Sequence, residues 1–77
     1  MLSKEAFRNR LRELRRERGE TQAEVGSALG IGARHYQKFE AEDNYPSAEN
    51  LCALADHFAV SLDYLMGRTD DRAAPGK

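Results

Sequence analysis

The sequence contains little of what would mark several large classes of protein. It has one cysteine, Cys52, in 77 residues, which excludes an intrachain disulfide and fits a reducing compartment. No apolar run approaches the roughly 18 residues that a membrane-spanning helix needs. The charged residues at the start of the chain do not resemble the apolar segment of a signal peptide. We therefore expect a cytoplasmic protein without a membrane partner.

Patterns typical of catalysis or ligand binding are missing as well. There is no Ser/His/Asp arrangement, no glycine-rich phosphate loop and no pair of carboxylates beside a base. His57 has no Cys, Asp or His partner placed to complete a metal site, and Cys52 fits a small packing residue beside Leu51. We expect no enzymatic activity, no metal, no cofactor and no small-molecule ligand.

The overall charge gives little support for a nucleic-acid partner, because 12 basic and 13 acidic residues leave a net charge of −1. The charges are nevertheless unevenly distributed. Residues 1–18 carry seven basic and three acidic side chains, whereas residues 41–77 carry three basic and seven acidic ones. Such asymmetry suits a protein that turns one face toward phosphates. A solvated first helix with many surface salt bridges explains the basic segment equally well.

Apolar residues at helical spacing predict an all-α fold with five helices and no strand. In the first helix, Phe7, Leu11 and Leu14 recur on one face after a cap at Ser3, and Gly19 ends the helix in a left-handed conformation. The predicted helices span about residues 4–18, 21–29, 33–41, 48–58 and 61–67. The domain is expected to cover residues 3–68, followed by a flexible tail over residues 69–77, where apolar periodicity is lost.

The predicted core follows from the apolar faces of these helices. A chain of 77 residues forms one small domain whose core is only marginally able to stabilise it. The residues expected to be largely buried are Phe7, Leu11, Leu14, Val25, Leu29, Ile31, Tyr36, Phe39, Leu51, Leu54, Phe58 and Leu65.

Residues 21–41 have the pattern of a helix-turn-helix pair, in which two short helices are joined by a tight turn. Thr21 and Glu24 have the spacing of a capping box at the start of the first helix. Gly30 lies in the turn, and Gly26 supplies a small residue where the two helices must cross closely.

The second helix of this pair carries two different faces on a helical wheel. Its core side holds Tyr36, Phe39 and Glu40, and its outer side holds Arg34, Gln37, Lys38 and Ala41, flanked by Ala33 and His35. Arginine and lysine suit guanine in the major groove, and glutamine suits adenine. A polar outer stripe is common on any surface helix, but the preceding turn makes DNA reading the stronger interpretation. For His35, contact with DNA and simple exposure on the helix flank are both open.

The run from Thr21 to Gly26, followed by Leu29-Gly30-Ile31, Tyr36, Phe39-Glu40 and Pro46-Ser47, resembles the lambda-repressor-like (Xre type) DNA-binding domains. The segment from Val60 to Asp70 is also typical of small phage-repressor-like regulators. The resemblance covers about residues 8–70. It implies a five-helix domain whose third helix enters the major groove of double-stranded DNA. It also implies a regulator of transcription, above all a repressor, that binds a palindromic operator as a dimer.

The resemblance also implies roles for particular residues. The DNA-binding positions would be Thr21, Gln22, Ala33, Arg34, His35, Gln37, Lys38 and Asn44. Gln22 would donate to a phosphate and support the start of the recognition helix. Arg15 and Glu40 match a pair that forms an internal salt bridge in similar domains, which agrees with the wheel because an unpaired carboxylate on the core side would be costly. The candidate contacts of a homodimer are Leu62, Tyr64 and Met66.

The sequence departs from the family after the recognition helix. Ala41-Glu42-Asp43-Asn44 stands where the family has Asn-Gly and basic residues, so two acids replace side chains that would touch phosphates. Gly32 stands where a capping Ser, Thr or Asn is common. These departures keep a second hypothesis open, namely a protein-interaction module of the same fold, antitoxin-like or anti-repressor, with weak DNA binding.

Overall fold

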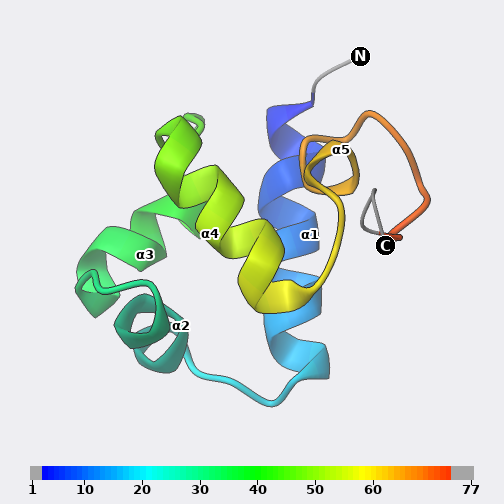
Figure 1. Ribbon diagram of the computed structural model, residues 1–77. Helices are drawn as coiled ribbons and strands as arrows, with labels where there is room; N and C mark the ends of the chain where they lie inside the picture. The colour runs from blue at the N-terminus through cyan, green and yellow to red at the C-terminus, as the bar shows by residue number, and fades with distance from the viewer. Residues whose placement is uncertain (1–2, 74–77) are drawn as a thin grey trace.

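The computed structural model (Figure 1) describes residues 3–73, which form five α-helices and no strand. The helices are α1 Lys4–Glu17, α2 Gln22–Ala28, α3 Ala33–Ala41, α4 Ala48–Phe58 and α5 Leu62–Leu65. The all-helical prediction is confirmed. The first two helices are one residue shorter than predicted at their C-terminal ends, because Arg18 and Leu29 are capping residues that follow the last helical residue.

Local sequence explains where four of the five helices begin. A side-chain oxygen accepts a hydrogen bond from the backbone N–H three residues later at Ser3, Thr21, Ser47 and Ser61. The capping box of α2 is complete, with Glu24 N donating to Thr21 Oγ1 at 3.0 Å and Thr21 N donating to Glu24 Oε1 at 2.7 Å. The exception is α3, which follows Gly32 and has no side-chain cap.

The core lies where α1 meets α3 and α5, and α4 extends it on the side of α5 (Figure 1). The buried apolar residues are Phe7, Leu11, Leu14, Val25, Tyr36, Phe39, Leu54, Ala55, Phe58, Val60, Tyr64 and Leu65. Leu29, Ile31 and Leu51 were predicted to be largely buried but are only partly so. Leu29 and Ile31 flank the turn between α2 and α3, where the chain lies at the edge of the core.

Two glycines shape the turn between α2 and α3. A Cβ at Gly26 would lie 3.0 Å from the carbonyl oxygen of Gly32, so the backbones of the two segments approach too closely for a larger residue. Gly30 has φ of +76°, a left-handed conformation that L side chains rarely adopt. The prediction that Gly26 permits a close crossing is confirmed.

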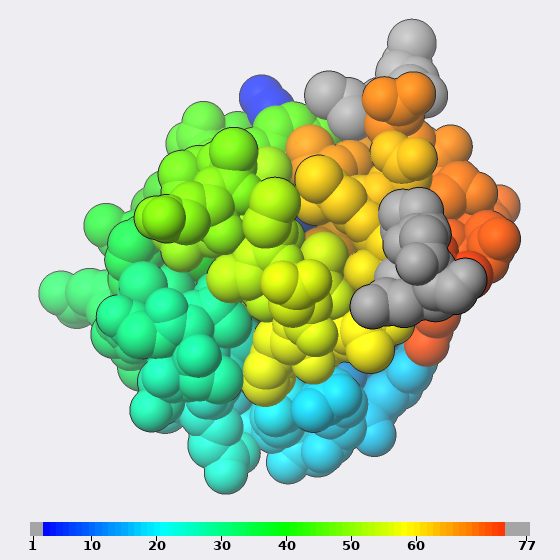
Figure 2. Space-filling view, in the orientation of Figure 1, coloured from blue at the N-terminus to red at the C-terminus, as the bar shows by residue number. Residues whose placement is uncertain are grey.

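Residues 69–73 are hydrogen-bonded to the helical part of the domain. They lie at the edge of the molecule opposite α2 and α3 (Figures 1 and 2). The backbone N–H of Ser61 donates to the carbonyl of Arg72 at 2.9 Å, and the Arg72 guanidinium donates to both carboxylate oxygens of Glu17 at 2.8 Å. Arg10 donates to the carbonyl of Thr69 at 2.8 Å. This part of the predicted flexible tail is therefore hydrogen-bonded to the domain, and residues 74–77 lie outside the described residues.

Within residues 3–73, none of the helices combines the length and the apolar character that crossing a membrane requires.

Candidate nucleic-acid interface

The outer face of α3 is exposed and polar. Ala33, Arg34, His35, Gln37 and Lys38 are all exposed, as the helical wheel predicted. Neither Arg34 nor Lys38 forms an ion pair with another residue of the 3–73 segment. Two cations and one amide therefore lie exposed on one helix face, and no ion pair with the described residues occupies either cation.

The inner face of α3 is packed tightly against the other helices. Tyr36 is fully buried, and Phe39 lies edge-on to its ring with 6.0 Å between the ring centroids. Glu40 is only 3% exposed. The contrast between the two faces means that α3 is held from behind, while its outer face remains available to a partner.

Glu40 is the centre of a polar network behind α3. Arg15 Nε donates to Glu40 Oε2 at 2.8 Å, and Arg15 Nη2 donates to Oε1 at 3.1 Å, so the pair predicted from the resemblance is present and bidentate. Gln22 Nε2 also donates to Oε1 at 3.1 Å. Burial raises the pKa of Glu40, but these hydrogen bonds outweigh it and hold the pKa below the ordinary carboxyl value. The hydrogen bonds that Arg15 donates to Glu40 raise the pKa of Arg15.

The placement of Gln22 differs from the expectation in one respect. Its amide contacts Glu40 near the end of α3 and so supports that end, not the start of the helix. The amide group has two N–H donors, of which Glu40 takes one. Thr21, also an expected DNA contact, is exposed but uses its hydroxyl and its backbone N–H in the capping box with Glu24.

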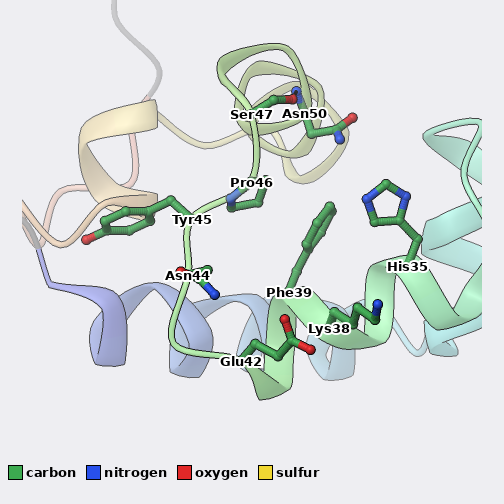
Figure 3. Close-up of a pocket in the computed structure, with 9 residues that line it drawn as sticks. All are labelled: His35, Lys38, Phe39, Glu42, Asn44, Tyr45, Pro46, Ser47 and Asn50. Carbon is green, nitrogen blue, oxygen red and sulfur yellow. Dashed lines mark hydrogen bonds between the residues drawn. The ribbon is translucent and has the colours of Figure 1, made fainter.

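An open groove of about 400 Å³ lies between α3 and the start of α4 (Figure 3). Phe39 projects from α3 toward α4, with His35 and Lys38 on one side, while Ser47 and Asn50 form the opposite wall. Asn44, expected to touch DNA, is exposed and lines this groove from the loop after α3. The ring of Tyr45 points away from the groove and packs edge-on against Phe7, with 5.5 Å between centroids.

Comparison with known proteins identifies the fold family. A family model described as helix-turn-helix matches residues 11–65, which include α2, α3 and the turn between them. The chain belongs to the helix-turn-helix family. The resemblance to lambda-repressor-like domains is thereby confirmed.

The curated relatives of this helix-turn-helix chain have names that refer to transcription. It is similar to the cryptic phage CTXphi transcriptional repressor RstR of Vibrio cholerae, with 36% identity over 62 residues, which are 80% of this chain and 55% of that protein. It is also similar to two Bacillus subtilis proteins. One is the uncharacterized HTH-type transcriptional regulator YobD, with 39% identity over 62 residues (80% of this chain, 55% of that protein). The other is the HTH-type transcriptional regulator ImmR, with 34% identity over 61 residues (79% and 48%).

The helix-turn-helix chain spans about half the length of these curated relatives. No solved structure gave a significant match.

The three candidate dimer residues differ in accessibility. Leu62 is 37% exposed, and Met66 is partly buried. Tyr64 is only 5% exposed, so it does not offer the surface that the sequence suggested. The guanidinium groups of Arg10 and Arg72 lie 4.1 Å and 5.3 Å from the centroid of its ring, and Arg72 Nε donates to its hydroxyl at 3.1 Å. Tyr64 is thus part of the attachment of residues 69–73.

Other polar contacts were not apparent from the sequence. His57 Nε2 lies 2.9 Å from Glu20 Oε1, which joins the end of α4 to the loop before α2. Arg12 donates to the Glu40 carbonyl near the end of α3, and Arg8 donates to Asp43 just beyond it. These partners lie 28 to 37 positions apart in sequence, so no local pattern could have revealed them. Within the described part of the chain, no cluster of His, Cys, Asp and Glu could hold a metal ion.

Proposed function

We propose that this helix-turn-helix chain binds double-stranded DNA sequence-specifically through α3 and regulates transcription, as a repressor. The observation that carries the proposal is the exposed face of α3, where Arg34, Gln37 and Lys38 have the chemistry to read base edges. The names of the curated relatives support the same function. Such a protein would act in the cytoplasm of a bacterium, where the DNA of the bacterium or of a phage lies.

One recognition helix reads only a few base pairs, so useful specificity requires a second half-site about 34 Å away along the duplex. We therefore propose a homodimer on a palindromic operator. Leu62 and Met66 are the candidate contacts that retain some exposure. Sedimentation of the protein with its best operator tests this, and one protomer bound per duplex would contradict it.

The first experiment is to select bound sequences from a random DNA pool and measure affinity for the best operator and its single-base variants. Arg34→Ala is expected to cost about 1–3 kcal/mol and to relax the preference at one base position, and Lys38→Ala should act in the same way at another. Gln22→Ala should weaken binding to all sequences more evenly than Arg34→Ala, because the amide N–H that Glu40 does not take can bind a phosphate, and phosphates carry no base identity. Equal, sequence-independent losses for all three variants would mean that α3 does not read bases.

A protein-interaction module is the second candidate, and the acidic side chains of Glu42 and Asp43 favour it. Both are exposed in the loop after α3, where they would face a phosphate backbone. Binding to random duplex at two salt concentrations separates the candidates, because phosphate-driven binding weakens steeply as salt rises. A protein without salt-dependent affinity for duplex would favour the interaction module.

A further inference from the structure

Three arginines form a row on α1 that faces the end of α3. Arg8, Arg12 and Arg15 follow one another at spacings of four and three residues, which places them on one side of the helix. Arg15 holds the Glu40 carboxylate, as described above. Arg12 Nη1 donates to the backbone carbonyl of Glu40 at 2.6 Å, and Arg8 Nη1 donates to Asp43 Oδ1 at 2.8 Å. We refer to these three residues as the arginine row.

The arginine row acts on the segment where α3 ends. The last carbonyls of a helix lack internal partners and carry partial negative charge, so a guanidinium at the Glu40 carbonyl is favourable. Arg8 then pairs with the acid just beyond the helix and compensates the charge of Asp43. The loop that departs from the family pattern is therefore attached to α1 by one of its two acids.

The contacts to the end of α3 come from the side of α1 that carries the arginine row. Arg16, one position beyond Arg15, is exposed, and its side chain makes no hydrogen bond or ion pair within residues 3–73. Arg10 lies on another side of α1 and contacts Asp70 at 2.7 Å. The contacts to Glu40 and Asp43 therefore come from one side of α1, and the arginines on its other sides either contact other segments or have no partner among residues 3–73.

We propose that Arg8 and Arg12 are positioning residues for DNA recognition, which set the direction of α3 and of the following loop from behind. This inference rests on the proposed function, since it concerns how α3 is presented to the bases. Neither residue needs to touch DNA in this role. The alternative is that both arginines bind phosphates directly, as exposed cations on a DNA-binding domain can.

The two roles differ in their effect on base discrimination, the ratio of affinities for the best operator and a single-base variant. A phosphate contact weakens both affinities alike, so their ratio is unchanged, and its loss reduces the slope of log affinity against log salt by about 1. A positioning residue changes how α3 meets the bases, so its loss lowers the ratio and leaves the salt slope unchanged.

The experiment compares Arg12→Gln, Arg8→Gln and Asp43→Asn in the full chain, with Arg16→Gln as the matched control. Arg16→Gln removes the same charge from the same helix without breaking a described contact. We expect Arg12→Gln to lower base discrimination about tenfold, and Arg8→Gln and Asp43→Asn to lower it about threefold each. These factors correspond to the free energies that a charge-assisted hydrogen bond and an exposed ion pair contribute. The Arg8→Gln/Asp43→Asn double variant should be no worse than either single one.

The expected salt slope of Arg8→Gln and Arg12→Gln equals that of Arg16→Gln. Wild-type discrimination in these variants, or a salt slope reduced by about 1 relative to Arg16→Gln, would overturn the inference. Base discrimination above the wild-type value in Asp43→Asn would also overturn the inference. If Arg12→Gln fails to fold, as circular dichroism would show, the variants of the partly buried Arg8 and the exposed Asp43 decide the question. Wild-type protein without salt-dependent DNA binding would instead overturn the proposed function on which the inference rests.

Discussion

The buried pair of Arg15 and Glu40 allows a prediction about stability and its dependence on pH. Substituting Arg15 by Leu would leave the Glu40 carboxylate, 3% exposed, with the Gln22 amide as its one remaining described partner. Breaking a buried ion pair by removing one partner costs about 3–5 kcal/mol. A domain of this size has a free energy of unfolding near the lower end of the usual range of about 5–15 kcal/mol. We therefore expect Arg15→Leu to be marginally folded at neutral pH.

The pH dependence should reverse in the variant. In the wild type the pKa of Glu40 is lower in the folded than in the unfolded chain, so its contribution is present above the ordinary carboxyl pKa of 4.5 and is lost as the pH falls through the folded-state value. Without Arg15, burial dominates and raises the pKa of Glu40 above the unfolded value. Arg15→Leu should then gain stability as the pH falls from 7 toward 5, whereas the wild type should not.

Urea unfolding followed by circular dichroism at several pH values measures both effects. Arg16→Leu serves as the control, because Arg16 is exposed on the same helix. Glu40→Gln should cost less than Arg15→Leu, about 1–3 kcal/mol, since the Arg15 guanidinium can still donate to the Glu20 carbonyl at 3.1 Å. If Arg15→Leu costs less than about 1 kcal/mol and keeps the wild-type pH profile, the pair is not the buried, coupled unit described here.

Three further stability predictions follow from packing. Gly26→Ala should destabilise by about 1–3 kcal/mol because its Cβ would meet the Gly32 carbonyl at 3.0 Å, whereas Gly32→Ala, whose Cβ meets no atom within 4 Å, should cost less in the same urea titration. Phe39→Ala should cost about 3–5 kcal/mol, and a cooperatively melting variant of near wild-type stability would contradict its place in the core. Tyr36→Phe should cost no more than about 1 kcal/mol, because the buried Tyr36 hydroxyl makes no hydrogen bond of ordinary geometry among residues 3–73, although burial raises the pKa of Tyr36 and the hydroxyl lies close enough to Glu40 for that carboxylate to raise it further; a larger loss would show that the hydroxyl is a partner of Glu40.

The features predicted correctly from the sequence are mostly those determined over a few residues. The capping box of Thr21 and Glu24 spans three positions, and the two faces of α3 follow from the helical repeat alone. Gly26 could be interpreted because a helix-turn-helix crossing requires a small residue at that place. In each case the spacing of residues within one helix or turn is enough to predict the structure.

The missed features depend on how the helices pack. Arg8 and Arg16 look alike in the sequence, yet Arg8 reaches Asp43 and Arg16 has no described partner, because the angle between α1 and α3 decides which arginine faces the loop. Tyr64 was predicted as a candidate dimer contact, yet it is only 5% exposed. Its burial depends on Arg10 of α1 and on Arg72, both of which lie outside its own helix.

Glu40 links the stability of the domain to the direction of its recognition helix. Its carboxylate joins α1 to α2 through Arg15 and Gln22, and its backbone carbonyl accepts from Arg12, yet its side chain lies on the face opposite the exposed one. A substitution here can weaken DNA binding in two ways. Partial unfolding divides the apparent affinity for every sequence by the same factor, about twofold when half the molecules are unfolded, and leaves base discrimination unchanged. A tilt of α3 changes the discrimination itself. Because the ratio of affinities is insensitive to the folded fraction, it measures the orientation of α3 even in variants that are only marginally stable.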